Sequence, residues 1–244
     1  MVNYKTDHRK KMADWWQSPL AGNVLDAERG LLQSNAHLFF GYMQLQLGVT
    51  PVLLPEVSRP TIKKVMADQA DIDGCYESLP IKWHSIDTLL LSHTLEFSPD
   101  PHQLLREAER VLVADGTLVL CCFNPWSLWG IRRLFSWQDS PPWQGHFFSL
   151  ARIKDWLALL NFDVVMVERT LFRPPIRSAK WFERCAFLER WGKRLWPVFS
   201  GVTIVVATKR TIPLTPITPR WQTKQLFPPR RLVTKPVTRE KSDG

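Results

Sequence analysis

Residues 86–124 most constrain the fold, because they read as a strand, a helix and a second strand in close succession. Ile86 to Leu91 is a short apolar run of the kind that a buried parallel strand requires. The prolines at 99 and 101 end that strand, and Pro101 suits the first turn of a helix. The apolar face of this helix is formed by Leu104, Leu105, Ala108, Val111 and Leu112. A turn at 114–116, with Gly116 in the left-handed position, leads to an apolar strand over 117–122, so the sequence predicts a right-handed βαβ unit.

The rest of the chain continues the alternation of strands and helices. Further strands are predicted over 42–48, 62–67, 162–167 and 202–208, and Ser149 can cap a helix over 150–160. A helical pattern covers about 20–40, with Leu25, Leu31, Leu32 and Leu38 near one face and with Asp26, Glu28 and Arg29 off it. This order predicts an α/β fold with a doubly wound, mostly parallel sheet.

The composition limits where the protein works. The four cysteines show neither a disulfide framework nor zinc-ligand spacing, so we expect a reducing, cytoplasmic setting and no metal. The N-terminus is charged and lacks the apolar core of a secretory signal. No window approaches the roughly 20 apolar residues of a membrane span.

Charge and composition divide the chain into three expected parts. These are a helical extension over 1–40, a main domain over 41–210, and a basic, proline-rich tail over 211–244 that is expected to be disordered. The tail carries +5 of the net charge of +9, so the main domain is only mildly basic. The tail could contact acidic partners, RNA or other nucleic acid, or anionic lipid, but a solvated tail is the favoured interpretation.

Two tryptophan-rich insertions interrupt the main domain, at 124–148 and 173–197. The first contains Trp126, Trp129, Trp137 and Trp143, with Arg132 and Arg133 between them. It could be an apolar lid over a binding site, packing against the body, or a stacking surface for nucleic acid. Lid and packing are favoured because the arginines are few, and the second insertion is expected to be helical.

The region 79–118 resembles the second half of class I S-adenosylmethionine-dependent methyltransferase domains of the type 11 kind. The matching residues are Leu79-Pro80, Ser85-Ile86-Asp87, Ser92-His93-Thr94-Leu95-Glu96-Phe97, Asp100-Pro101, Leu104-Leu105-Arg106-Glu107, Arg110-Val111-Leu112 and Asp115-Gly116-Thr117-Leu118. The resemblance implies a seven-stranded sheet whose last strand is antiparallel. It also implies S-adenosylmethionine as cofactor, bound at the carboxyl ends of the first strands, and a small or apolar methyl acceptor.

The cofactor residues follow from the same resemblance. The family's glycine-rich turn is reduced here to Gly48, after the strand that contains Gln46, and side chains occupy the following positions. The acid that holds the ribose corresponds to Asp68. The adenine-contacting acid falls on Cys75, beside Tyr76, with Asp73 and Glu77 as nearby substitutes. Ser92 and His93 would form one wall of the site.

His93 is the candidate catalytic residue, because an imidazole that titrates near neutral pH could act as a general base. The favoured interpretation is a packing residue that lines the cofactor pocket. Methyl transfer needs no conspicuous acid–base pair, since the sulfonium is already activated. The missing glycines keep a second function open, an inactive methyltransferase-like binding or regulatory protein, and a third is a nucleic-acid-associated protein.

Overall fold

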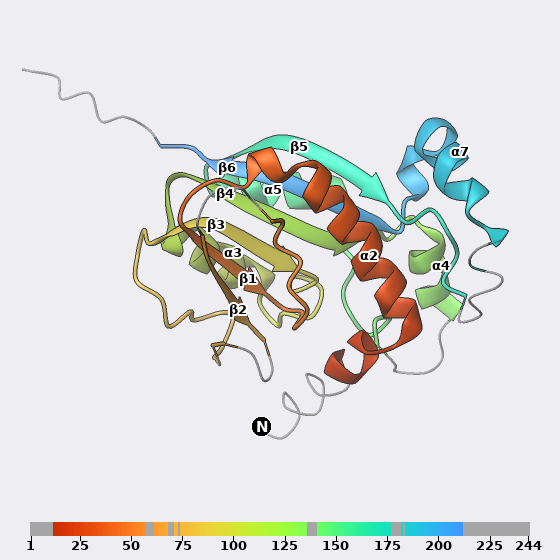
Figure 1. The fold of residues 1–244 in the computed structure, drawn as a ribbon, viewed down its shortest axis with the longest axis horizontal. Coiled ribbons are helices and arrows are strands. Elements are labelled where there is room, and N and C mark those ends of the chain that lie inside the picture. Colours follow the sequence, from red (N-terminus) through yellow and green to blue (C-terminus); the bar gives the residue numbers. More distant parts are fainter. Residues whose placement is uncertain are drawn as a thin grey trace, which may run out of the picture. The chain divides into compact units, whose positions relative to one another are not determined.

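In the computed structural model the described residues are 12–56, 61–67, 71–72, 74–135, 141–176, 182 and 184–211. They form a six-stranded sheet in the order β2-β1-β3-β4-β6-β5 (Figure 1). Its strands are β1 (Met43–Leu47), β2 (Ile62–Met66), β3 (Ile86–Ser92), β4 (Leu112–Phe123), β5 (Phe162–Thr170) and β6 (Val202–Lys209). The pairs among β2, β1, β3 and β4 are parallel, whereas β6 runs antiparallel to both β4 and β5. The predicted mostly parallel sheet with an antiparallel last strand is therefore confirmed.

The expected seventh strand is the exception, because the sheet has six strands in the described part of the chain. Among the described residues between β2 and β3 there are two isolated bridges, Met66 with Ile72 and Cys75 with Ser78. Residues 71–78 contain Gly74 and mostly polar side chains; Ile72 and Tyr76 pack against the core but do not form the continuous apolar run of a buried strand.

The βαβ unit forms as predicted, with α3 (Pro101–Val111) between β3 and β4. Asp100 caps α3 by accepting a hydrogen bond from the Gln103 amide at 2.9 Å, and Pro101 occupies the first turn. The turn after α3 differs from the prediction, since Asp115 rather than Gly116 takes the left-handed conformation, with φ 58°. An aspartate adopts this conformation more readily than most residues do.

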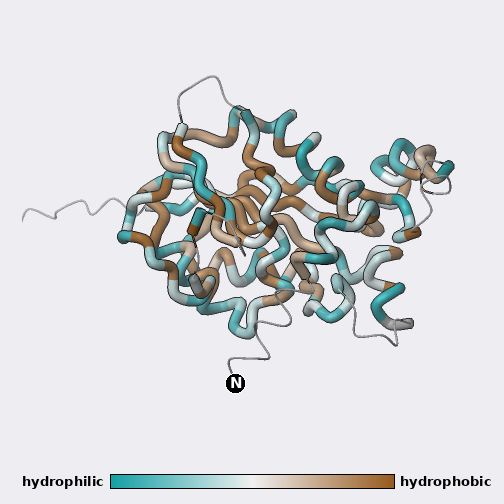
Figure 2. Tube along the Cα trace, turned by 60° about the horizontal axis from the view of Figure 1, so that its bottom comes forward, coloured by the Kyte–Doolittle hydropathy of each residue, from teal (hydrophilic) through white to brown (hydrophobic). Residues whose placement is uncertain are grey.

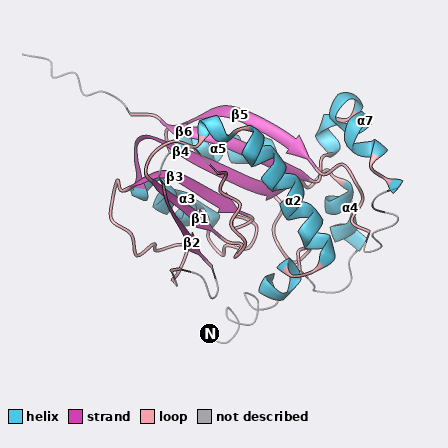
Figure 3. Cartoon of the chain, viewed as in Figure 1, coloured by secondary structure: helices cyan, strands magenta, loops and turns pink. Residues whose placement is uncertain are grey.

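Helices cover both faces of the sheet (Figure 3). On one face α2 (Pro19–Ser34) packs its Leu20, Val24 and Leu25 in the same core as Leu90 and Val119. On the other face α3 and α5 (Leu150–Leu159) pack in a second core with the alternate strand residues, such as Leu89, Leu91, Leu118 and Leu120. The apolar segments accordingly gather along the strands in Figure 2. The alternation of strand side chains thus divides the core into two layers.

The N-terminal helix is shorter than predicted, and one of its residues was misplaced. The α-helix ends at Ser34, and the 3₁₀ helix η1 (Ala36–Leu38) follows it. Glu28, which the pattern placed off the apolar face, is fully buried because it lies one turn after Val24 and one turn before Leu32. The N-terminal helix therefore brings a carboxylate into the core.

The remaining elements lie beyond the carboxyl end of β4 and the amino end of β6. They are α4 (Leu128–Phe135), α7 (Phe187–Leu195) and the 3₁₀ helix η2 (Pro197–Phe199). The helix α7 covers residues 187–195 of the 173–197 insertion, and residues 177–181 and 183 of that insertion lie outside the described residues. Residues 212–244, which make up nearly all of the basic tail, lie outside the described residues. No helix in the described part of the chain is both long enough and apolar enough to cross a bilayer.

Candidate functional site

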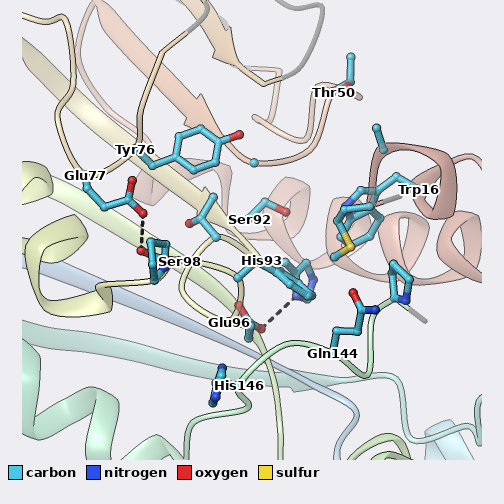
Figure 4. A pocket seen from close by; sticks show the side chains of 17 residues that line it. Trp16, Thr50, Tyr76, Glu77, Ser92, His93, Glu96, Ser98, Gln144 and His146 are labelled. Carbon is cyan, nitrogen blue, oxygen red and sulfur yellow. Dashed lines mark hydrogen bonds and ion pairs between the residues drawn. The ribbon is translucent and has the colours of Figure 1, made fainter. Parts of the chain in front are cut away.

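A cavity of about 410 Å³ opens at the carboxyl ends of β1 and β3 (Figure 4). This volume lies within the range of small-molecule sites. Residues from four parts of the chain line the cavity: the N-terminal helical residues, the turn after β1, the segment 76–77, and the turn after β3. Pro141, Gln144 and His146 complete the wall. Its position is the switch point of the sheet, since β1 has β2 on one side and β3 on the other.

Gly48 closes β1 at the edge of this cavity. Its φ is +110°, a conformation that side-chain-bearing residues rarely adopt, and its amide donates to Met66 O at 3.1 Å. A Cβ at this position would collide with the backbone oxygen of Ser92. The glycine is therefore required for the close approach of the turns that follow β1 and β3.

Gln46 does not line the cavity but holds the loop after Gly48 in place by hydrogen bonds. Its fully buried side chain donates from Nε2 to Val49 O and to Pro51 O, both at 2.8 Å. Its Oε1 accepts from the Leu53 amide at 2.7 Å. Three hydrogen bonds from one side chain thus fix the loop that replaces the family's glycine-rich turn, and Thr50 of this loop lines the cavity.

His93 follows β3 directly and lies between two carboxylates. Its φ is 52°, and its Nε2 lies 2.6 Å from Oε1 of Glu28 on α2. Its Nδ1 lies 3.3 Å from Oε1 of Glu96, a contact drawn in Figure 4. The same Glu96 oxygen accepts from the Phe123 amide at 2.6 Å. All three ionisable side chains are at most 1% exposed, so they form a buried Glu28–His93–Glu96 cluster.

The cluster fixes the charge of His93. Burial lowers its pKa, but the charges and hydrogen bonds of Glu28 and Glu96 outweigh burial and raise the pKa to about 10. The ring also packs against Trp16 and Phe123, with centroid distances of 5.2 and 4.1 Å. An imidazolium that donates from both nitrogens has no lone pair for a proton. This geometry does not fit a general base and favours the other interpretation of His93, a residue that packs and lines the pocket.

The other predicted cofactor residues fall into three groups. Ser92 and Tyr76 line the cavity, as Gly48 and His93 do. Cys75 is exposed and absent from the lining, and its Sγ donates to Glu77 Oε2 at 2.7 Å. Asp68 lies outside the described residues, as does Asp73.

Glu77 lines the cavity where Cys75 was expected to. Its Oε1 accepts from Ser98 Oγ at 2.7 Å (Figure 4). The carboxylate thus lies two residues after the position that the family pattern indicated. Since a short loop can shift by two residues without changing the strands around it, the pattern alone did not locate this acid.

The sequence prediction missed Trp16, Glu28 and Glu96. For Glu96 a signal was present, because it lies between Leu95 and Phe97 within the apolar end of the family motif. For Glu28 the signal was its spacing of four from Val24 and Leu32. Neither pattern shows that the two acids meet one histidine, since Glu28 and His93 are 65 residues apart.

The first tryptophan-rich insertion mainly packs against the body. Trp129 is fully buried and stacks on Phe123 at 5.6 Å, and Trp143 stacks on Trp129 at 6.4 Å. Arg132 lies over the Trp143 ring at 4.3 Å. Trp137 lies outside the described residues. Only residues 141–146 of this insertion reach the cavity, so its packing role dominates in the described residues.

Comparison with known proteins agrees with this geometry. A family model described as a methyltransferase domain matches residues 41–120. The uncharacterised protein YafS of Escherichia coli K12 is 41% identical over 150 residues, which are 60% of this chain and 57% of YafS. The chain thus matches less than two thirds of that relative's length.

Solved structures share the fold at low sequence identity. A methyltransferase from Thermotoga maritima, described as S-adenosylmethionine-dependent and as a possible histamine N-methyltransferase, is 20% identical with a TM-score of 0.51. The match covers 75% of this chain and 90% of that one. A second, from Aquifex aeolicus, is 12% identical with a TM-score of 0.52 and covers 81% and 96% of the two chains. Residues 41–120 therefore match the model of a methyltransferase domain, and the chain shares the fold of solved S-adenosylmethionine-dependent methyltransferases.

Proposed function

We propose that the cavity beside Gly48 binds S-adenosylmethionine and that the protein transfers its methyl group to a small or apolar acceptor. The observation that carries this proposal is the position of the cavity. It opens at the switch point between β1 and β3, inside the matched domain, where open α/β sheets bind their ligands. When bound, the cofactor supplies a methyl group that its sulfonium already activates.

The residues around the cavity fit this cofactor in shape. Gly48 is the one position of the glycine-rich turn where a side chain has no room, and this glycine is kept. Thr50 stands at a second glycine position of that turn, on the rim of the cavity, and is exposed. The cavity therefore stays open although the other glycines are absent.

The charges around the cavity also suit a positively charged cofactor. Glu77 and Glu96 line the cavity, Glu28 contacts His93 without lining the cavity itself, and His93 contributes one positive charge. A site with this balance favours a positively charged ligand, as a sulfonium is. Glu77 and Tyr76, side by side on one wall, are the residues that would replace the aligned but exposed Cys75.

The chain's own contribution to the reaction is positioning and exclusion of water. Trp16 covers one side of the cavity, and Phe97, Pro99 and Pro141 add apolar surface for an acceptor. His93, held as an imidazolium by Glu28 and Glu96, acts as a fixed part of the wall. Such a site accelerates methyl transfer by alignment and desolvation without a general base.

Calorimetry with S-adenosylmethionine and S-adenosylhomocysteine tests this proposal. We expect binding by the natural chain and a loss of at least about tenfold in affinity for Thr50→Trp, whose ring would enter the cavity. The matched control is Val52→Trp on the same loop, because Val52 is 49% exposed and does not line the cavity. No heat with either ligand at millimolar concentration would contradict the proposal.

The inactive binding protein remains a second candidate, supported by the missing glycines at 50 and 52. It predicts that S-adenosylhomocysteine binds while no methyl group is consumed with any acceptor. A nucleic-acid-associated function stays a prediction, since the basic tail that suggested it lies outside the described residues apart from Thr211. The cytoplasmic location likewise stays a prediction.

A further inference from the structure

The helix α7 presents an apolar face to solvent. Phe187, Trp191 and Leu195 recur every fourth residue and are 60, 59 and 50% exposed. Trp196, Val198 and Phe199 extend this surface across η2 and are 58, 53 and 48% exposed. These six residues are called the α7 face below. Six exposed apolar side chains along one short segment of the chain indicate an interaction surface.

The orientation of α7 is fixed from its inner side. Glu189 accepts hydrogen bonds from the amides of Leu171 and Phe172 at 2.8 and 3.0 Å. Gly192 is buried against the Phe172 ring, where a side chain would not fit. Because the inner side is held by these contacts, the aromatic residues of the α7 face are turned away from the body.

The charges beside the face indicate what it contacts. Arg190 and Arg194 lie three residues after Phe187 and Trp191, so they flank the apolar stripe, and both are exposed. Lys193 is exposed as well. Glu189 is the only acid between residues 186 and 199, and it points inward to its two amide partners. The outer side of α7 is therefore aromatic and cationic.

We propose that the α7 face binds the surface of an anionic lipid bilayer. Tryptophan and phenylalanine beside arginine and lysine is the pattern of helices that lie in the bilayer interface, with the apolar side among the acyl chains. Cations at the edge of such a helix attract anionic headgroups. A protein partner would need an equally apolar and acidic surface, and this occupant becomes an outcome of the test.

The α7 face lies at the same edge of the sheet as the cavity. The strand before α7 ends at Thr170, which pairs with Val202, and Val202 pairs with Phe123 at the carboxyl end of β4. Trp83 lies at the opposite edge, three residues before β3 begins, and is 65% exposed. This tryptophan is therefore a matched control for exposure and residue type.

Flotation of the full-length chain with vesicles tests the proposal. We expect the natural chain to float with phosphatidylcholine vesicles that contain phosphatidylglycerol. Trp191→Gln combined with Trp196→Gln should reduce the bound fraction at least about tenfold, while Trp83→Gln leaves it unchanged. Arg190→Gln combined with Arg194→Gln should weaken binding to the anionic vesicles about 25-fold, since each cation near the surface contributes about fivefold. Urea unfolding checks that each variant is folded.

All of these variants keep the basic tail, so a difference between them reports on the α7 face alone. Equal flotation of the natural chain and the double tryptophan variant would overturn the proposal in favour of the tail. Absence of flotation by the natural chain would also overturn it. If the natural chain did not float but self-associated in a way that depends on Trp191, the α7 face would be a protein contact.

Discussion

Residues 86–123 and residues 19–56 meet at the cavity, but different kinds of contact hold them in place. In the first region the strands and α3 follow each other directly, and a local cap at Asp100 starts the helix. In the second region buried polar side chains do the positioning. Glu28 reaches His93 across 65 residues, and Gln46 fixes the loop after Gly48. One wall of the cavity thus depends on the pattern of strands and helix. The other depends on buried polar contacts, of which Glu28–His93 spans 65 residues and those of Gln46 span 3 to 7.

The largest effect in this comparison is expected for Glu28→Ala. The substitution leaves the imidazolium of His93 buried with one of its two carboxylates gone. Removal of one partner from a buried ion pair costs about 3–5 kcal/mol of unfolding free energy. Urea unfolding measures this loss. A loss below about 1 kcal/mol would mean that the cluster is not formed in solution.

Gly48→Ala should have the next largest effect. A Cβ there meets the Ser92 carbonyl, and φ of +110° is strained for alanine, so we expect a loss of about 3 kcal/mol. Gly22→Ala is the matched control, because Gly22 lies within α2 with nothing within 4 Å of the added Cβ. That variant should gain about 0.5–1 kcal/mol in unfolding free energy. Equal changes in unfolding free energy for the two variants would contradict the conclusion that position 48 requires a glycine.

The buried cluster also predicts how stability depends on pH. The pKa of His93 is about 10 in the folded protein and 6.5 as its ordinary value, so its stabilising contribution is complete below pH 6.5 and is lost as pH rises through 10. Between pH 7 and 8.5 the unfolding free energy should fall by up to about 1.4 kcal/mol per pH unit. The window ends near the ordinary thiol pKa of about 8.5, because above it the buried Cys121 and Cys122, whose thiol pKa values burial raises in the folded protein, would lower the stability in the same direction.

Urea unfolding of the natural chain and of Glu28→Gln across this window measures the effect. The variant should show a smaller slope, because glutamine removes the charge that raises the histidine pKa most among its partners. Parallel slopes for the two proteins would contradict a protonated His93.

The smallest effect is expected for Asp100→Ala in the locally built wall. It removes one hydrogen bond, from the Gln103 amide to the capping carboxylate. Loss of such a cap costs about 1 kcal/mol, several times less than the loss expected for Glu28→Ala. Thermal and urea unfolding of both variants in parallel measure the ratio. If Asp100→Ala lost as much unfolding free energy as Glu28→Ala, the two walls of the cavity would not differ in how they are stabilised.

The same contrast explains how much the sequence predicted. The six strands and α3 follow from apolar runs, prolines and a capping residue, which act over a few positions. Gly48, Tyr76, Ser92 and His93 were placed at the cavity by the family motif. The same motif assigned Gln46 and Cys75 to the cofactor site. Gln46 instead holds the loop after Gly48 by hydrogen bonds, and Cys75 is exposed.

Glu28 shows why the remainder could not be predicted. Its helix pattern indicates on which face it lies, but its partner is chosen by the packing of α2 onto the sheet. A helix can pack with the same apolar residues at several offsets, and only one of them brings the carboxylate to His93. The sequence contains no local signal for that offset.

Hydrogen exchange with and without S-adenosylhomocysteine tests whether the cofactor binds in the cavity beside Gly48, because it reports where the ligand binds. We expect slower amide exchange at residues 48–53 and 92–97 when the ligand is present, and no such change in Thr50→Trp. Unchanged exchange in both segments of the natural chain, or protection confined to other parts of it, would contradict a cofactor site at the ends of β1 and β3.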